Sequence, residues 1–131
     1  MISRAELRQI SRERLKDARV LLRAGRFDGA IYLGGYVVEV ALKERVCRTL
    51  RWTGFPQTRN EFQNYQTFKT HNLDVLLSLS GVETLVKTKY LAEWSAAAAW
   101  DPEARYNPIG SASRADAELL VEAARTLLRV L

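Results

Sequence analysis

Residues 27–50 read FDGAIYLGGYVVEVALKERVCRTL, and this stretch decides the fold of the chain. It is apolar on nearly every side at the helical period, which is typical of a helix at the centre of a bundle. At about 100° per residue, one stripe of this helix nevertheless carries polar groups, from Tyr32 and Tyr36 to Glu39 and Lys43. Because buried polar groups are costly without partners, the stripe predicts either a structural polar network or the floor of a binding site.

The length and composition of the chain limit what it can be. Its 131 residues predict one domain, residues 1–131, with a core of its own. The single cysteine excludes an intrachain disulfide, and one cysteine with one histidine leaves no thiolate and imidazole set for zinc. No metal and no cofactor are predicted. No apolar run approaches the roughly 20 residues of a membrane span, and the first residues lack the apolar stretch of a signal peptide, so we expect a cytoplasmic protein.

The positive charge of the chain is concentrated at its start. The net charge is +5, and residues 1–26 hold eight basic side chains against three acidic ones, whereas the remainder is neutral. This segment predicts an amphipathic helix over residues 3–24, capped by Ser3 with Glu6 at the capping-box position and ended by Gly25.

An arginine stripe lies beside the predicted apolar face of this first helix. The apolar face consists of Leu7, Ile10, Ala18 and Leu21. The members of the stripe are Arg4, Arg8, Arg12, Arg19 and Arg23, with Arg26 at its end. Such a stripe is either a solvated face or a surface for nucleic-acid phosphates or an acidic partner.

The rest of the chain shows helical periods and no strand alternation, so we expect an all-α fold, a four- to five-helix up-and-down bundle. The second helix is predicted to begin after a cap at Asp28 and to end near Leu50. Three more helices are predicted over residues 71–79, 82–100 and 114 onward, with Thr70 and Ser113 as caps of the first and last. The side chains of the last helix expected to face inward are Leu119, Leu120, Ala123, Leu127 and Leu128.

Residues 51–70 form a long connection without a sustained period. Its length of about 20 residues is large for a compact domain and is typical of a binding or lid segment. Aromatic side chains are expected to anchor it to the bundle, namely Trp52, Phe55, Phe62, Tyr65 and Phe68.

Three segments carry a family signal through their order and spacing. They are AIYLGGYVVEVALK at 30–43, THNL at 70–73 and ARYNP at 104–108, and the first helix adds an A-x-LL-like step at 18–22. In this order they resemble the HEPN (higher eukaryotes and prokaryotes nucleotide-binding) domain family. The resemblance covers most of the chain and excludes residues 51–69.

The resemblance implies a helical bundle that commonly forms homodimers and associates with nucleotides or RNA. It also implies a small nucleotidyltransferase as a candidate partner, in toxin–antitoxin or defence systems. Many members of the family are ribonucleases that use an arginine, four to six spacer residues and then a histidine.

That ribonuclease motif is absent from this chain. His71 is the only histidine, and residues 64–66, where the arginine of the motif would stand, are Asn-Tyr-Gln. The corresponding positions after Arg105, residues 110–112, are Gly-Ser-Ala. The chain therefore resembles a member without the family's Arg/His pair, and no catalytic residue is predicted.

Five residues are predicted to converge on one cleft: Glu39, Lys43, His71, Arg105 and Tyr106. In this interpretation Lys43 and Arg105 hold phosphate, because a guanidinium binds phosphate in a bidentate manner.

Four of these residues, Glu39, Lys43, His71 and Arg105, also have a purely structural interpretation. Glu39 and Lys43 are spaced for an ion pair within one helix, and His71 can cap or flank a helix. Arg105 can pair with Asp101 or Glu103. Two tryptophans, Trp94 and Trp100, are expected in the core or at a dimer interface, with base stacking as the alternative.

The sequence thus predicts a non-catalytic HEPN-like module that binds a nucleotide or nucleic acid as a homodimer. Two alternatives stay open. One is a ribonuclease-type toxin with a divergent site in which His71 and Glu39 act as acid and base. The other is a structural interaction module whose arginine stripe docks a partner.

Overall fold

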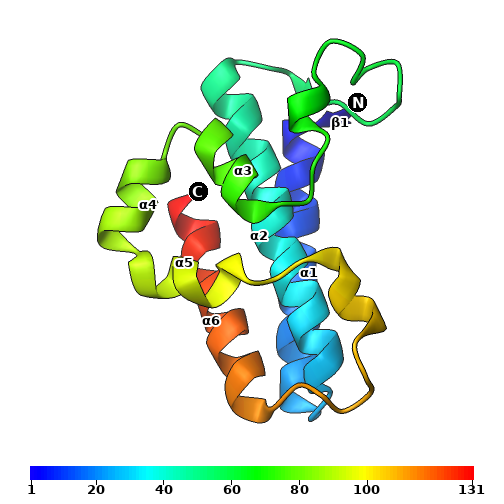
Figure 1. Cartoon of the computed structure of the whole chain (residues 1–131), viewed down its shortest axis with the longest axis vertical. Helices are drawn as coiled ribbons and strands as arrows, with labels where there is room; N and C mark the ends of the chain where they lie inside the picture. The colour runs from blue at the N-terminus through cyan, green and yellow to red at the C-terminus, as the bar shows by residue number, and fades with distance from the viewer.

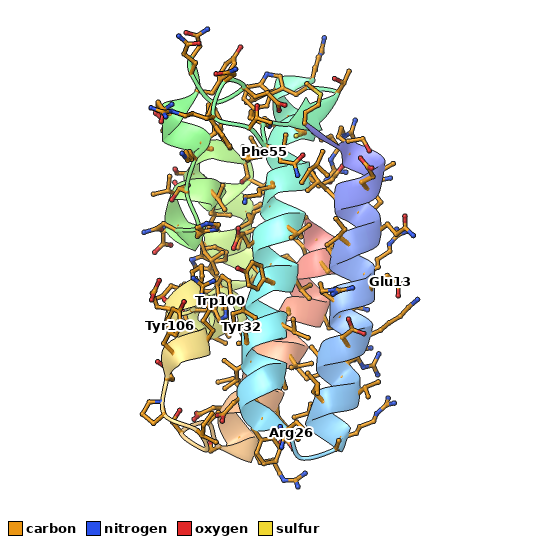
Figure 2. The ribbon with its side chains drawn as sticks, turned by 90° about the vertical axis from the view of Figure 1, so that its right-hand side faces the viewer. Glu13, Arg26, Tyr32, Phe55, Trp100 and Tyr106 are labelled. Atoms are coloured by element: carbon orange, nitrogen blue, oxygen red, sulfur yellow. The ribbon has the colours of Figure 1, made fainter.

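The computed structural model describes all of residues 1–131 and shows an all-α bundle of six helices. Helix α2 runs the length of the molecule, with α1 on one side and the short helices α3, α4 and α5 on the other (Figure 1, Figure 2). The C-terminal helix α6 packs against α1, α2 and α5. The helices are α1 (Arg4–Arg23), α2 (Phe27–Leu50), α3 (Leu73–Leu79), α4 (Glu83–Lys89), α5 (Leu91–Ala98) and α6 (Arg114–Val130).

The start of α1 confirms the predicted capping box. The hydroxyl of Ser3 accepts a hydrogen bond from the backbone N–H of Glu6, and the Glu6 carboxylate accepts one from the backbone N–H of Ser3 at 2.9 Å. The chain turns after this helix at Gly25, whose φ of 75° favours glycine.

The start of α2 differs from the prediction. The helix begins at Phe27, so Asp28 lies in its first turn and is not its cap. The carboxylate of Asp28 instead accepts hydrogen bonds from the backbone N–H groups of Gly110 and Ala112, at 2.7 and 3.0 Å. Asp28 therefore fixes the loop that leads into α6, and these two bonds hold the pKa of its carboxyl below the usual range.

Three other predictions about the secondary structure were wrong. The helix predicted over residues 82–100 is broken at Tyr90, where φ is −130° and ψ is 33°, into α4 and α5. Helix α3 is capped by the Asn72 side chain rather than by Thr70. Two short strands, β1 (Ile2–Ser3) and β2 (Gly54–Phe55), pair antiparallel where no strand was expected. The chain also forms two 3₁₀ turns, η1 (Gln66–Phe68) and η2 (Pro102–Tyr106).

The core confirms the central place of α2. Its buried side chains extend through the whole helix: Ala30, Val37, Val38, Glu39, Ala41, Leu42, Glu44, Val46 and Cys47. In α6, Leu120 faces the core as expected, whereas Leu119 is 61% exposed. Ile10 of α1 is also exposed, at 39%, contrary to the prediction.

The aromatic connection is anchored as predicted. Phe55 and Phe62 are buried, and their ring centroids lie 6.1 Å apart. The centroid of the Trp52 ring lies 4.9 Å from that of the Phe68 ring and 5.0 Å from that of the Tyr65 ring. The segment is therefore joined to the main core at one end of α2, although Tyr65 itself is 43% exposed.

The paired glycines Gly34 and Gly35 have different reasons to be small. A Cβ atom at Gly35 would lie 2.0 Å from Cδ2 of Trp100, so the indole ring rests directly on the backbone of α2. A Cβ atom at Gly34 would lie 3.6 Å from Leu120, which is an ordinary contact. Only Gly35 is required by packing.

We expect Gly35→Ala to lower the free energy of unfolding by about 2 kcal/mol, because overpacking against Trp100 outweighs the gain in helix propensity. Urea denaturation followed by circular dichroism measures the loss.

Gly34→Ala is the matched control. It gains the same helix propensity without a clash, so its stability should equal or exceed that of the original protein by up to about 1 kcal/mol. Equal stabilities of the two variants would contradict the packing argument.

Candidate functional site

The polar stripe of α2 begins with two tyrosines in mutual contact. The rings of Tyr32 and Tyr36 meet edge to face, with centroids 5.1 Å apart, and Tyr36 meets Trp100 in the same manner at 5.0 Å. Burial, followed by contact with Tyr32 and the negative charge of Glu39, raises the pKa of Tyr36 to about 12. Its phenol therefore stays neutral at physiological pH and serves as a hydrogen-bonding group.

One turn further along α2, the buried Glu39 contacts both Lys43 and His71. The side chain of Glu39 is only 2% exposed, and its Oε1 atom lies 2.8 Å from Lys43 Nζ and 2.7 Å from His71 Nδ1. The ammonium of Lys43 also lies over the ring of Phe55, 5.4 Å from its centroid. Lys43 is therefore held by a carboxylate and an aromatic face, which is the ion pair that the spacing allowed.

The histidine of this contact faces solvent. His71 is 60% exposed, and only its Nδ1 atom has a protein partner. The turn that carries it is ordered, because Thr70 accepts a hydrogen bond from the backbone N–H of Asn72. Glu39 thus orients the imidazole and leaves Nε2 available to a bound molecule.

Two buried polar atoms near this contact lack partners. Oε2 of Glu39 is an acceptor without a donor, and Nε1 of Trp100 is a donor without an acceptor. Trp100 rests on Gly35, one helical turn from Glu39. Buried polar groups are normally paired, so this face of α2 has unused hydrogen-bonding capacity.

Arg105 lies in η2, beside the tyrosine end of the stripe. Its guanidinium lies over the Tyr106 ring, 4.9 Å from the centroid, and contact with the hydroxyls of Tyr32 and Tyr106 raises its pKa. The predicted alternative of an ion pair with Asp101 or Glu103 was wrong, since no carboxylate lies within 4.0 Å of this guanidinium. Its positive charge remains unneutralised.

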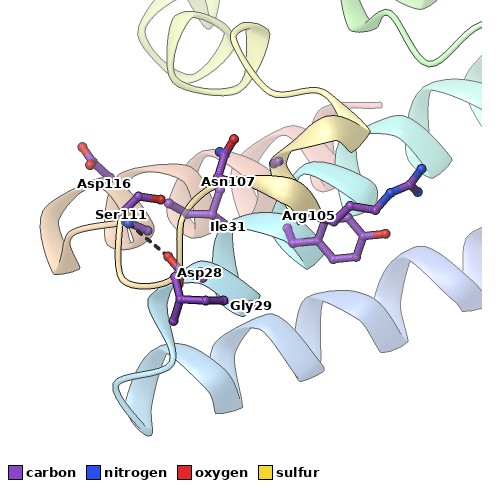
Figure 3. Close-up of a pocket in the computed structure, with 11 residues that line it drawn as sticks. Asp28, Gly29, Ile31, Arg105, Asn107, Ser111 and Asp116 are labelled. Carbon is purple, nitrogen blue, oxygen red and sulfur yellow. Dashed lines mark hydrogen bonds between the residues drawn. The ribbon is translucent and has the colours of Figure 1, made fainter.

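A cavity of about 470 Å³ opens between the start of α2, η2 and the loop before α6. Figure 3 shows Asp116 and Ser111 toward one end, Arg105 at the other, and Asn107 between them. Tyr32 completes the wall beside Arg105. The cavity therefore has acceptors at one end, and at its other end the guanidinium of Arg105 extends past Tyr32, away from those acceptors.

The five predicted site residues do not meet at one point. Arg105 and Tyr106 lie near Tyr32, whereas Glu39 and His71 lie near Lys43, and Tyr32 and Lys43 are separated by about 16 Å of helix rise. Figure 2 shows the separation, with Tyr32 and Tyr106 grouped at mid-height and Phe55, the neighbour of Lys43, near the upper end. The prediction that Lys43 and Arg105 hold one phosphate was therefore wrong.

Two arginines of the α1 stripe are bound to an acidic side chain of α2 that had no predicted role. Glu44 of α2 is 6% exposed, and its Oε1 atom accepts hydrogen bonds from Arg4 and Arg8. Arg12, Arg19 and Arg23 form no ion pair. Part of the stripe therefore stabilises the α1–α2 contact, and part of it stays free.

Several cavity residues had no predicted role. The sequence predicts Asp28 as a helix cap and places Asn107 and Ser111 in a loop and Asp116 in the first turn of the last helix, whereas all four line the cavity. Two features of the sequence could have indicated these cavity residues. They are the polar side chains between Pro102 and Pro108 and the helix cap at Ser113. The predicted core position of Trp94 and Trp100 was correct, since both are buried.

No group of three acidic, histidine or cysteine side chains lies close enough to hold a metal ion. None of the helices is both long and apolar enough to cross a membrane.

Comparisons of the chain with protein-family models, with curated proteins and with solved structures gave no match. The likeness to the HEPN family consequently rests on the sequence motifs alone.

We expect Glu39→Gln to lower the free energy of unfolding by about 2 kcal/mol, because the substitution leaves the partly buried Lys43 without its counter-charge. Urea denaturation at neutral pH measures the change.

Glu83→Gln provides a control with the same spacing. Glu83 pairs with Lys87 at i,i+4, but both side chains are nearly half exposed, so the loss should stay below about 0.5 kcal/mol. Losses of similar size in the two variants would show that burial of Glu39 contributes nothing.

Proposed function

We propose that the chain is a non-catalytic, HEPN-like nucleotide-binding module whose ligand occupies the cavity beside Arg105. The observation that carries this proposal is the unneutralised guanidinium of Arg105, held over Tyr106 and against Tyr32 without a carboxylate partner. A guanidinium held in place by aromatic side chains binds phosphate with little loss of side-chain entropy.

The shape and polarity of the cavity support a ligand of this size and chemistry. A volume of about 470 Å³ falls within the range of sites for small molecules. A nucleotide carries donors on its base and sugar and negative charge on its phosphate. The carboxylate of Asp116 and the polar side chains of Asn107 and Ser111 suit the first part, and Arg105 suits the second.

This arrangement assigns different roles to Arg105 and Lys43. Lys43 is neutralised by Glu39 and is 19% exposed, so it supports the fold more than it binds an anion. Arg105 is the phosphate ligand in the proposal. His71, exposed further along α2, contacts only a ligand that extends beyond the cavity.

We expect Arg105→Ala to weaken binding of ATP or GTP about tenfold or more, because it removes the phosphate ligand. Isothermal titration calorimetry with the purified chain measures the affinity.

Arg114→Ala is the matched control, because Arg114 also lies over an aromatic ring, that of Phe27, and does not line the cavity. Its affinity should stay within about twofold of that of the original protein. Absence of nucleotide binding, or equal losses in the two variants, would refute the proposed site.

A second candidate function is RNA cleavage, which the contact between His71 and Glu39 favours. A carboxylate 2.7 Å from Nδ1 of an exposed histidine is the arrangement that orients an imidazole for proton transfer through Nε2. In such a reaction the 2′-hydroxyl attacks the phosphorus and gives up its proton, the bond to the 5′-oxygen breaks, and the leaving 5′-oxygen takes up a proton. His71 transfers one of these protons and water the other.

If the chain cleaves RNA, His71→Ala should abolish cleavage of a fluorescent RNA, and Glu39→Gln should reduce it by a smaller factor. Intact RNA after incubation with the original protein would leave the binding module as the function. The homodimer and the nucleotidyltransferase partner stay predictions of the family resemblance.

A further inference from the structure

A second hollow lies between α1, α2 and α6, away from the nucleotide cavity. It has a volume of about 470 Å³, and four arginines line it: Arg8, Arg12, Arg48 and Arg129. We call these four residues the arginine cluster. Its floor contains the buried Ser11 and Ala41, whose small side chains leave the space open.

The charge of this hollow is not neutralised within the chain. Glu44 is the only acidic side chain that lines it, and Leu131 adds the carboxylate at the end of the chain, so four arginines against two carboxylates leave a net charge of +2. The Glu44 carboxylate is already shared by Arg4 and Arg8. Arg12 and Arg129 are exposed and form no ion pair.

The neighbouring side chains confirm a concentration of positive charge. Arg48 donates a hydrogen bond to an oxygen of Leu131, whose carboxylate at the end of the chain offsets part of its charge. Burial lowers the pKa of Arg45, and the positive charge of Arg48 lowers it further. The Nε atom of Arg45 is buried without a partner.

The positive surface continues along α1. A shallow groove of about 700 Å³ shares Arg8 and Arg12 with the cluster and extends it to Lys16 and Arg19. From Arg8 to Arg19 the helix rises through eleven residue steps, by about 16 Å. Since phosphates of one duplex strand follow each other at about 3.4 Å along the helix axis, this length matches several consecutive phosphates.

We propose that the arginine cluster and the adjoining groove of α1 bind the phosphate backbone of a double-stranded nucleic acid. Neither hollow is lined by an aromatic side chain, so there is no platform on which unpaired bases stack, whereas guanidinium groups contact phosphates of any sequence. The surface lies on the side of α2 opposite the nucleotide cavity, since Glu13 of the groove and Tyr106 point to opposite sides in Figure 2. The proposal is therefore independent of the nucleotide site.

The test compares two charge-reversed double variants that change the net charge equally. Arg12→Glu with Arg129→Glu alters the surface at two exposed residues without ion pairs. Arg59→Glu with Lys89→Glu does the same at exposed positions outside it. Fluorescence anisotropy with labelled duplex RNA and duplex DNA, measured over a series of salt concentrations, gives the affinity and its salt dependence.

The cluster variant should lose about tenfold or more in duplex affinity. The slope of log affinity against log salt should become shallower by about 2, because two phosphate contacts are lost. The control variant should keep the slope and lose about threefold at most. A preference for RNA or for DNA identifies the duplex that the surface binds, and equal affinities show that it accepts either duplex. Calorimetry with ATP should show unchanged nucleotide binding in the cluster variant, which separates this surface from the Arg105 site.

Three outcomes would overturn the proposal. They are no duplex binding at low salt, equal losses in the two double variants, and binding of polyglutamate as tight as binding of the duplex. The last of these would assign the surface to an acidic protein partner. Circular dichroism of both double variants establishes that the loss of binding is not a loss of fold.

Discussion

The burial of α2 on all sides is the constraint on which the rest of the structure depends. Burying a charge in that position is costly without a partner, and the partners come from different parts of the chain. His71, ahead of α3, meets Glu39, and arginines of α1 meet Glu44. Trp100, after α5, covers Gly35. The bundle is thus assembled around the polar and small residues of its central helix.

This arrangement places two arginine environments on opposite sides of the same helix. On one side, a single guanidinium, that of Arg105, contacts tyrosine hydroxyls at the edge of a cavity, where we propose one small phosphate ligand. On the other side, several guanidinium groups line a hollow and an adjoining groove, where we propose a long polyanion. The difference lies in the surroundings of the arginines, because their chemistry is the same.

The sequence predicted α2, its central position and the caps at Ser3 and Ser113, because helical period and capping are local properties. The break at Tyr90 was not predictable in this way, since no glycine or proline marks it and Trp94 is placed by its hydrogen bond to Asp74 of another helix. For the site, spacing predicted the pair of Glu39 and Lys43. The separation of Arg105 from Lys43 depended on where η2 meets α2, which is a tertiary property.

The contact between Trp100 and Gly35 has a consequence for how such a chain can evolve. Trp100 comes two residues before η2, so a side chain at position 35 would push away both the indole and the turn that carries Arg105. Substitutions at this glycine would therefore be selected against twice, once for the stability of the bundle and once for the position of the cation. A residue that touches no ligand would then vary as little as one that does.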